Sequence, residues 1–191
     1  MKTRIYVGVI ALIGLALRLF NLGTPKGFVF DELYYVDGAR DYLAHGVEVS
    51  GDDPEFVVHP PVGKWVIASG EAIFGATPFG WRIAIAILGI LSVLLTARIA
   101  RRLTNSNLIG TVAGLLLALD GLHIAMSRSA LLDMTLSFFV LCAFGFLILD
   151  RDCLNTGGTK TWRWAMVVAL GLACATKWRG VYFAAAFGIL M

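Results

Sequence analysis

Residues 79–100 read FGWRIAIAILGILSVLLTARIA, an apolar run with one arginine near each end and no charge between them. An α-helix needs about 20 predominantly apolar residues to cross the hydrocarbon core of a bilayer. Comparable runs recur along the chain, which is not a feature of soluble domains. We therefore predict an all-α polytopic membrane protein with spans at residues 5–22, 79–100, 108–125, 131–149, 162–176 and 181–191.

The composition agrees with this fold class. Of the 191 residues, 58% are hydrophobic and 15% are charged, and the mean hydropathy is +0.78. The first run follows two basic residues but no small-x-small cleavage site follows it, so we interpret it as a retained span rather than a signal peptide. Glycines inside the runs, such as Gly110 and Gly114, are expected to allow close helix packing. The last run is unfinished at Met191, and we expect the chain to be the N-terminal part of a longer protein.

The sequence predicts neither a metal site nor a nucleic-acid partner. Its three cysteines, Cys142, Cys153 and Cys174, form no CxxC pair, and the three histidines show no ligand spacing with them. No basic face with interleaved aromatic residues occurs in a water-exposed domain. We expect no cofactor and no metal, and the membrane lipid itself as the surrounding partner.

The first two spans are separated by a long polar loop, residues 23–78. Its apolar spacing predicts a short amphipathic helix over residues 32–45, stopped by Gly46, and a second from residues 60–61 to Gly75 with a face suited to the membrane interface. At the start of the first helix, VFDELYY (residues 29–35) places Asp31 beside Glu32.

Two readings of Asp31 stay open at this point. It could be the N-cap of the predicted helix, with Glu32 favourable in the first turn. It could also be a catalytic carboxylate near the lipid surface. Neighbouring residues on a helix project about 100° apart, so Asp31 and Glu32 cannot form a matched pair on one surface. If one is catalytic, the other has a different task.

The basic residues predict the orientation. With a cytoplasmic N-terminus, the short loops on that side hold eight basic residues against Asp150 and Asp152, whereas the other side holds eight basic and eleven acidic residues. The positive-inside rule therefore favours a cytoplasmic N-terminus and places the loop of residues 23–78 on the extracytoplasmic face.

Charged residues gather near the span ends on this predicted outer side. Interfacial anchoring accounts for Arg82, Arg179 and Trp178. For Arg128 and Asp133, a functional role and a structural ion pair are equally open. The full set on this side comprises Asp31, Glu32, His59, Lys64, Arg82, Asp120, His123, Arg128, Asp133, Lys177 and Arg179.

Carboxylates and cations at lipid depth suit one type of reaction. A sugar linked to a lipid phosphate leaves behind a stable phosphate anion, which Arg or Lys can stabilise. A carboxylate then deprotonates the incoming hydroxyl. The expected chemistry is glycosyl transfer with inversion at the sugar carbon.

Five motifs in register closely resemble the protein O-mannosyltransferase family, in particular its actinobacterial branch. They are FDELYY (30–35), HPPVGK (59–64), GWR (80–82), SRSALLD (127–133) and ATKWRG (175–180). The resemblance implies the GT-C glycosyltransferase fold and a cell-membrane enzyme. Such an enzyme takes mannose from a polyprenyl-phosphate-mannose donor (dolichyl in eukaryotes) and attaches it to Ser or Thr of secreted proteins.

The resemblance also implies roles for individual residues. Asp31 would be the base or hydroxyl-positioning carboxylate, and Glu32 its supporting partner in acceptor or sugar binding. Arg128 would help to hold the site. The implied substrate-binding set further includes His59 and Lys64, which shape the loop near the donor, together with Asp133 and the additional cation Lys177. Further donor-binding residues are expected beyond residue 191.

Two other functions remain open from the sequence. A GT-C relative could glycosylate a lipid or a cell-wall glycan with the same pocket chemistry. A membrane transporter is the second alternative, but it predicts charges near mid-span and broken helices, whereas the charges here gather at one interface.

Overall fold

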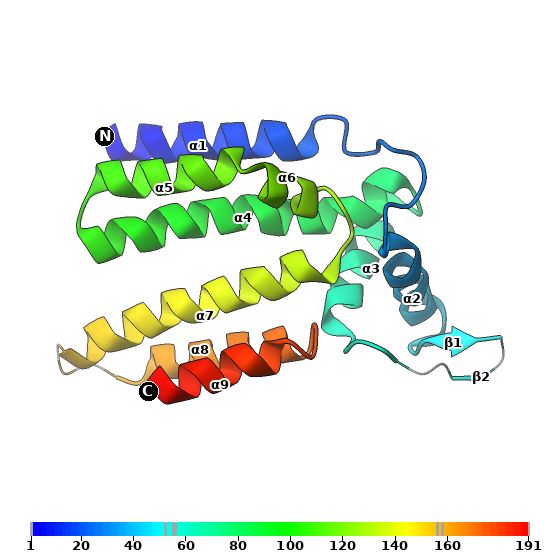
Figure 1. Ribbon diagram of the computed structural model, residues 1–191. Coiled ribbons are helices and arrows are strands. Elements are labelled where there is room, and N and C mark those ends of the chain that lie inside the picture. The colour runs from blue at the N-terminus through cyan, green and yellow to red at the C-terminus, as the bar shows by residue number, and fades with distance from the viewer. Residues whose placement is uncertain (1, 52, 55–56, 156, 158, 191) are drawn as a thin grey trace.

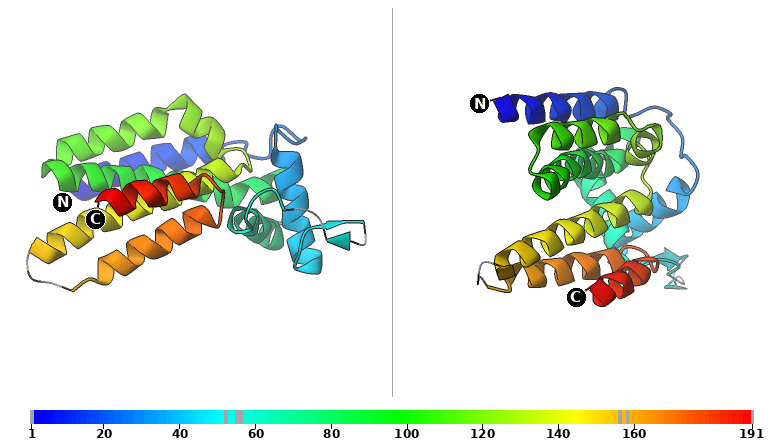
Figure 2. Two further views of the ribbon diagram at one scale, coloured as in Figure 1. Left: turned by 60° about the horizontal axis from the view of Figure 1, so that its bottom comes forward. Right: turned by 60° about the vertical axis from the view of Figure 1, so that its left-hand side comes forward.

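The computed structural model describes residues 2–51, 53–54, 57–155, 157 and 159–190. Its main body is a set of helices that run side by side (Figures 1 and 2). The central helix is α4, which packs against α1, α5 and α7, while α8 and α9 pack beyond α7. The bounds are α1 (Lys2–Leu19), α4 (Pro78–Thr104), α5 (Asn107–Leu119), α6 (Gly121–Ser127), α7 (Leu132–Asn155), α8 (Thr161–Cys174) and α9 (Gly180–Leu190).

Local sequence signals fix the ends of α4. The Thr77 hydroxyl accepts a hydrogen bond from the backbone N–H of Gly80 (3.1 Å), and Pro78 occupies the first turn, where its missing N–H costs nothing. The helix ends at Asn105, which adopts a left-handed conformation (φ 51°). Ser106 then caps α5, so a two-residue turn returns the chain antiparallel against α4.

The loop of residues 23–78 folds as a compact unit at one end of the bundle (Figure 1). It contains α2 (Glu32–His45), α3 (Val62–Phe74) and a small antiparallel pair of strands, β1 (Val49–Ser50) and β2 (Asp53–Pro54). Gly46 (φ 76°) ends α2 and Gly75 (φ 82°) ends α3, so both predicted amphipathic helices are confirmed.

This unit shares a hydrophobic core with the bundle. Val36 of α2 and Ile67 of α3 are fully buried against Trp81 of α4 and Leu132 of α7. Burial of such side chains contributes about 1.5–3 kcal/mol each. The loop therefore has a fixed position relative to the ends of α4 and α7.

The helices differ in how well they suit a membrane span. By length and apolar composition, α4 and α7 can each cross a membrane, and α5 with α6 makes a third candidate if this pair, bent by 63°, is one span. The apolar stretches of α1, α8 and α9 are shorter, and their assignment as spans stays a prediction. Residue 191, at the end of the last predicted span, lies outside the described residues.

The predicted span 108–125 is thus interrupted, which the apolar run does not predict. Asp120 sits at the break and caps α6 by accepting a hydrogen bond from the backbone N–H of His123 (2.6 Å). The fully buried Arg18 of α1 donates to the last carbonyls of α5, those of Leu117 (3.3 Å) and Ala118 (3.2 Å). The break is stable because side chains satisfy the backbone groups that it frees.

Close packing of α4 against α5 gives a first prediction. A Cβ atom on Gly110 would lie 2.7 Å from the Ala97 carbonyl oxygen, whereas a Cβ on Gly171 of α8 would meet nothing within 4 Å. Gly110→Ala should therefore lower the free energy of unfolding by about 1–3 kcal/mol through overpacking. Gly171→Ala should be neutral or slightly stabilising, because alanine favours helix. Thermal unfolding of the two purified variants measures both effects. Equal unfolding midpoints would contradict the close approach of Gly110 to the Ala97 carbonyl.

Candidate active site

The five motifs meet at the end of the bundle that carries α2 and α3. Glu32 joins the first motif to the third through Arg82 and to the fourth through the backbone N–H of Ala130. The fifth motif contacts the second: the Val62 N–H donates to the Ala175 carbonyl (3.0 Å), and the indole N–H of Trp178 donates to the Val58 carbonyl (2.9 Å). Segments more than 100 residues apart thus form one polar region.

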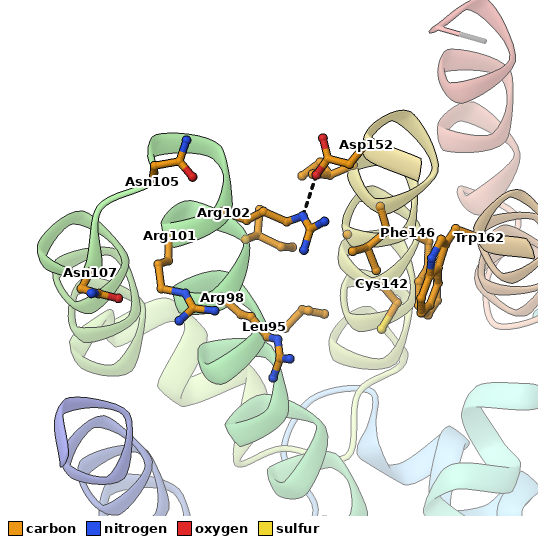
Figure 3. Close-up of a pocket in the computed structure, with 14 residues that line it drawn as sticks. Leu95, Arg98, Arg101, Arg102, Asn105, Asn107, Cys142, Phe146, Asp152 and Trp162 are labelled. Atoms are coloured by element: carbon orange, nitrogen blue, oxygen red, sulfur yellow. Dashed lines mark hydrogen bonds and ion pairs between the residues drawn. The ribbon is translucent and has the colours of Figure 1, made fainter. Parts of the chain in front are cut away.

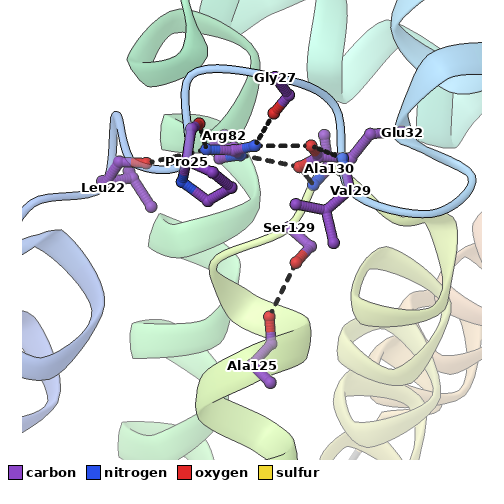
Figure 4. A network of polar contacts seen from close by, with 9 residues as sticks. All are labelled: Leu22, Pro25, Gly27, Val29, Glu32, Arg82, Ala125, Ser129 and Ala130. Carbon is purple, nitrogen blue, oxygen red and sulfur yellow. Dashed lines mark hydrogen bonds and ion pairs between the residues drawn. The ribbon is translucent and has the colours of Figure 1, made fainter.

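A fully buried ion pair between Glu32 and Arg82 lies at the centre of these contacts (Figure 4). The guanidinium donates to both carboxylate oxygens, from Nε to Oε1 (2.8 Å) and from Nη2 to Oε2 (2.7 Å). Its remaining donors reach the backbone carbonyls of Leu22, Pro25 and Gly27. The carboxylate also accepts from the backbone N–H groups of Val29 (2.8 Å) and Ala130 (2.7 Å).

This pair corrects one expectation. Arg82 is not an interfacial anchor: its side chain is 0% exposed, because the loop of residues 22–27 folds over it. Glu32 is equally enclosed, and its oxygens accept hydrogen bonds from the guanidinium and two backbone N–H groups. The role of Glu32 in acceptor or sugar binding that the resemblance implies stays a prediction.

Asp31 is placed quite differently from its neighbour. It occupies the N-cap position of α2, as the first reading predicted, but its side chain accepts no hydrogen bond from a backbone N–H of the helix. The preceding residue, Phe30, adopts a left-handed conformation (φ 54°) that a bulky side chain rarely takes. This turn directs the two adjacent carboxylates differently: Glu32 is buried, while Asp31 remains partly exposed.

A tyrosine orients the Asp31 carboxylate. The Tyr35 hydroxyl, one helical turn further along α2, donates a long hydrogen bond to Asp31 Oδ2 (3.4 Å). Burial, followed by the negative charges of Asp31 and Asp133, raises the pKa of Tyr35 to about 12. The phenol therefore stays protonated at neutral pH and acts only as a donor toward Asp31.

His59 lies next to this tyrosine, with ring centroids 6.1 Å apart. Burial and the positive charges of Lys177 and Lys64 lower the pKa of His59, so the imidazole is neutral near pH 7. Its buried Nδ1 has no hydrogen-bond partner among the described residues. The role of His59 in shaping the loop near the donor stays a prediction.

Lys64 is almost completely buried and forms an ion pair with Glu48, which follows α2. Glu48 was not singled out in the sequence. A Cβ atom on Gly38 would lie 2.9 Å from Glu48 Oε2, so the glycine leaves space for this pair. The charge of Lys64 is thus neutralised by Glu48, and the role of Lys64 near the donor stays a prediction.

Asp133 and Lys177 form the ion pair that the sequence left open for Asp133. Lys177 Nζ lies 2.9 Å and 3.0 Å from the two carboxylate oxygens. Arg128, the partner considered earlier, instead donates to four backbone carbonyls at the end of α1, and the nearest is that of Phe20 (2.7 Å). A cation at a helix C-terminus is stabilising, so Arg128 fixes the end of α1. That Arg128 helps to hold the site stays a prediction.

Comparison with known proteins identifies the family. The family model described as dolichyl-phosphate-mannose-protein mannosyltransferase matches residues 8–191. The chain belongs to this family. The polyprenol-phosphate-mannose–protein mannosyltransferase of Mycobacterium tuberculosis is 46% identical over 211 residues, covering 97% of this chain and 40% of its own length. The enzyme of the same name from Corynebacterium glutamicum is 38% identical and covers 95% of this chain and 40% of its own length.

Two solved structures of membrane glycosyltransferases share the fold. The protein O-mannosyltransferase Pmt1-Pmt2 complex of S. cerevisiae, bound to the sugar donor, superposes with a TM-score of 0.86 at 24% identity, over 100% of this chain and 28% of that one. ArnT from Cupriavidus metallidurans gives 0.75 at 24% identity, over 95% and 34%. These likenesses confirm the predicted GT-C fold. The chain spans about 40% of the length of its curated relatives.

The buried pair gives a second prediction. Glu32→Gln leaves the Arg82 guanidinium buried without its counter-charge, which costs about 3–5 kcal/mol of stability. Asp31→Asn, which removes the neighbouring charge from a partly exposed site, should leave the free energy of unfolding within about 0.5 kcal/mol of wild type. Thermal unfolding of the two variants side by side measures the contrast, and a stable Glu32→Gln protein would contradict the structural role.

A third prediction concerns His59 and pH. Its pKa is lowered in the folded state, so the unfolded chain binds a proton first as the pH falls through the ordinary value of 6.5. The stability that the neutral imidazole contributes is present above pH 6.5 and is lost on acidification. Replacing His59 with Gln should therefore flatten the decline in unfolding midpoint between pH 7 and pH 5. If the unfolding midpoints of wild type and His59→Gln fall equally between pH 7 and pH 5, groups other than His59 cause the decline.

Proposed function

We propose that the complete protein transfers mannose from a polyprenyl-phosphate-mannose donor to Ser or Thr hydroxyls of secreted proteins, with Asp31 as the base. One observation carries the assignment of Asp31. The other two carboxylates of the five motifs, Glu32 and Asp133, are each paired with a cation, and so is Glu48 beside the second motif. Asp31 has only the Tyr35 hydroxyl as a partner among the described residues. The names of the two bacterial relatives support the donor and the protein acceptor.

The proposed reaction follows from these surroundings. Asp31 accepts the proton of the acceptor hydroxyl, whose oxygen forms a bond to the anomeric carbon of mannose. The bond from that carbon to the phosphate breaks on the opposite face, which inverts the configuration. The leaving lipid phosphate takes the electron pair of that bond and gains a second negative charge, which the positive charge of Arg179, near Tyr35 and His59, favours. Tyr35 keeps the carboxylate oriented.

We further propose that this end of the bundle faces away from the cytoplasm. The distribution of basic residues supports this orientation, and a secreted acceptor requires it. The interruption between α5 and α6 is a feature expected of transporters. Here, however, the Arg18 side chain donates hydrogen bonds to the backbone carbonyls at the break. Because these groups have partners within the described residues, the break favours a structural role in an enzyme over a substrate path in a transporter.

The test is transfer of radiolabelled mannose from polyprenyl-phosphate-mannose to a Ser/Thr-rich peptide by membranes that contain the complete protein. Asp31→Asn should reduce transfer by about 10²- to 10⁴-fold, the usual contribution of a general base. Asp37→Asn is the matched control, because Asp37 is an exposed carboxylate on the same helix. It should retain wild-type transfer.

Each outcome discriminates between functions. Loss of peptide labelling with Asp31→Asn alone supports the proposal. Labelling that depends on Asp31 but appears in a lipid or glycan fraction would support the same transfer reaction with Asp31 as the base. It would show that the acceptor is a lipid or a glycan instead of a protein. Wild-type transfer by Asp31→Asn would remove Asp31 from the mechanism.

A further inference from the structure

A second polar region lies at the opposite end of the bundle, beside the α4–α5 turn (Figure 1). Here a pocket of about 770 Å³ opens between α4, α5 and α7. Its lining combines basic residues of α4 with the amides of Asn105 and Asn107 and with apolar side chains of α7 (Figure 3). It includes none of the residues assigned above to mannosyl transfer.

Three arginines of α4 supply the charge of this pocket. Arg102 forms an exposed ion pair with Asp152 of α7 (2.7 Å). Arg98 and Arg101 are exposed and make no hydrogen bond or ion pair with the described residues. The pocket therefore keeps two positive charges whose donors are available to a ligand.

The rest of the pocket lining is largely apolar. Leu95 and Ile99 lie on α4 among the arginines, Phe146 lies on α7, and Trp162 of α8 is stacked on Phe146 (centroids 5.9 Å apart). Tryptophan is typical of the membrane–water boundary, where its ring is partly apolar and partly wet. The pocket thus presents cations at its mouth and a hydrocarbon-like wall along the two helices.

We propose that this pocket binds an anionic phospholipid, with its phosphate between Arg98 and Arg101 and an acyl chain against Leu95, Ile99 and Phe146. The planar guanidinium groups donate pairs of hydrogen bonds to phosphate oxygens, and the asparagine amides are further donors at the same depth. Basic pockets between helices on the cytoplasmic side suit anionic headgroups, which are concentrated in that leaflet. The orientation proposed above puts this end of the bundle there.

Other occupants fit the pocket less well. Free inorganic phosphate would use the arginines and leave the apolar wall exposed. A later segment of the complete protein would have to bring carboxylates of its own, because burying two unpaired guanidinium groups is costly. A zwitterionic lipid would place its own positive charge close to the arginines, and the repulsion would weaken its binding. An anionic phospholipid satisfies both the charge and the apolar wall.

The test is native mass spectrometry of the complete protein in a neutral detergent, titrated with phosphatidylglycerol or phosphatidylcholine of the same acyl chains. Wild type should retain one phosphatidylglycerol selectively. The double variant Arg98→Gln/Arg101→Gln should bind it about thirty-fold more weakly, since each basic residue contributes about five-fold. The control Arg151→Gln removes an exposed arginine at the same end that donates to the Leu190 carbonyl and does not line the pocket. It should bind as wild type does.

A fluorescence measurement locates the lipid independently of the arginine variants. Phosphatidylglycerol with brominated chains should quench wild-type tryptophan emission, and Trp162→Phe should remove most of this quenching. Equal binding of both lipids, or unchanged binding by the double variant, would overturn the proposal. So would displacement of the lipid by millimolar inorganic phosphate, which would identify a free-phosphate site. Mannosyl transfer is not measured, so failure here leaves the proposed function untouched.

Discussion

The arrangement of the candidate active site depends on one buried ion pair, Glu32 with Arg82. Removing two charges from water is expensive, and the attraction between them offsets that cost only when the remaining donors and acceptors are also satisfied. Here the guanidinium reaches both carboxylate oxygens and three backbone carbonyls, and the carboxylate accepts two further N–H groups. Such a pair tolerates little displacement, so it fixes the loop of residues 22–32 onto α4.

That constraint explains how two adjacent carboxylates come to have different tasks. Glu32 is held by contacts that close around it, and the left-handed turn at Phe30 leaves its neighbour Asp31 outside this network. A base is most effective when its position is set before the substrate arrives. The cost of a bulky residue at φ 54° is of the order of 1–2 kcal/mol, which is small beside a buried ion pair with seven hydrogen-bonding contacts.

The two ends of the helical bundle use charge in opposite ways. At the end that carries α2 and α3, cations pair with carboxylates contributed by segments distant in sequence, and Asp31 remains as an accessible acceptor. At the other end, Asp150 and Asp152 neutralise Arg163 and Arg102, which leaves Arg98 and Arg101 available. The first arrangement suits proton transfer beside a phosphate ester, and the second suits retention of an anion at the membrane surface.

The sequence by itself determined the elements and the end of the bundle at which the motifs gather. Apolar runs of helical length predict α4 and α7, and Gly46 and Gly75 end α2 and α3, because these signals are local. Only the tertiary structure decided which charges meet. Glu32 and Arg82 are 50 residues apart, and Lys177 and Asp133 are 44 apart, so no periodicity links them. Likewise, the break after Leu119 is stable because Arg18, about 100 residues away, satisfies its carbonyls, and an apolar run gives no sign of that.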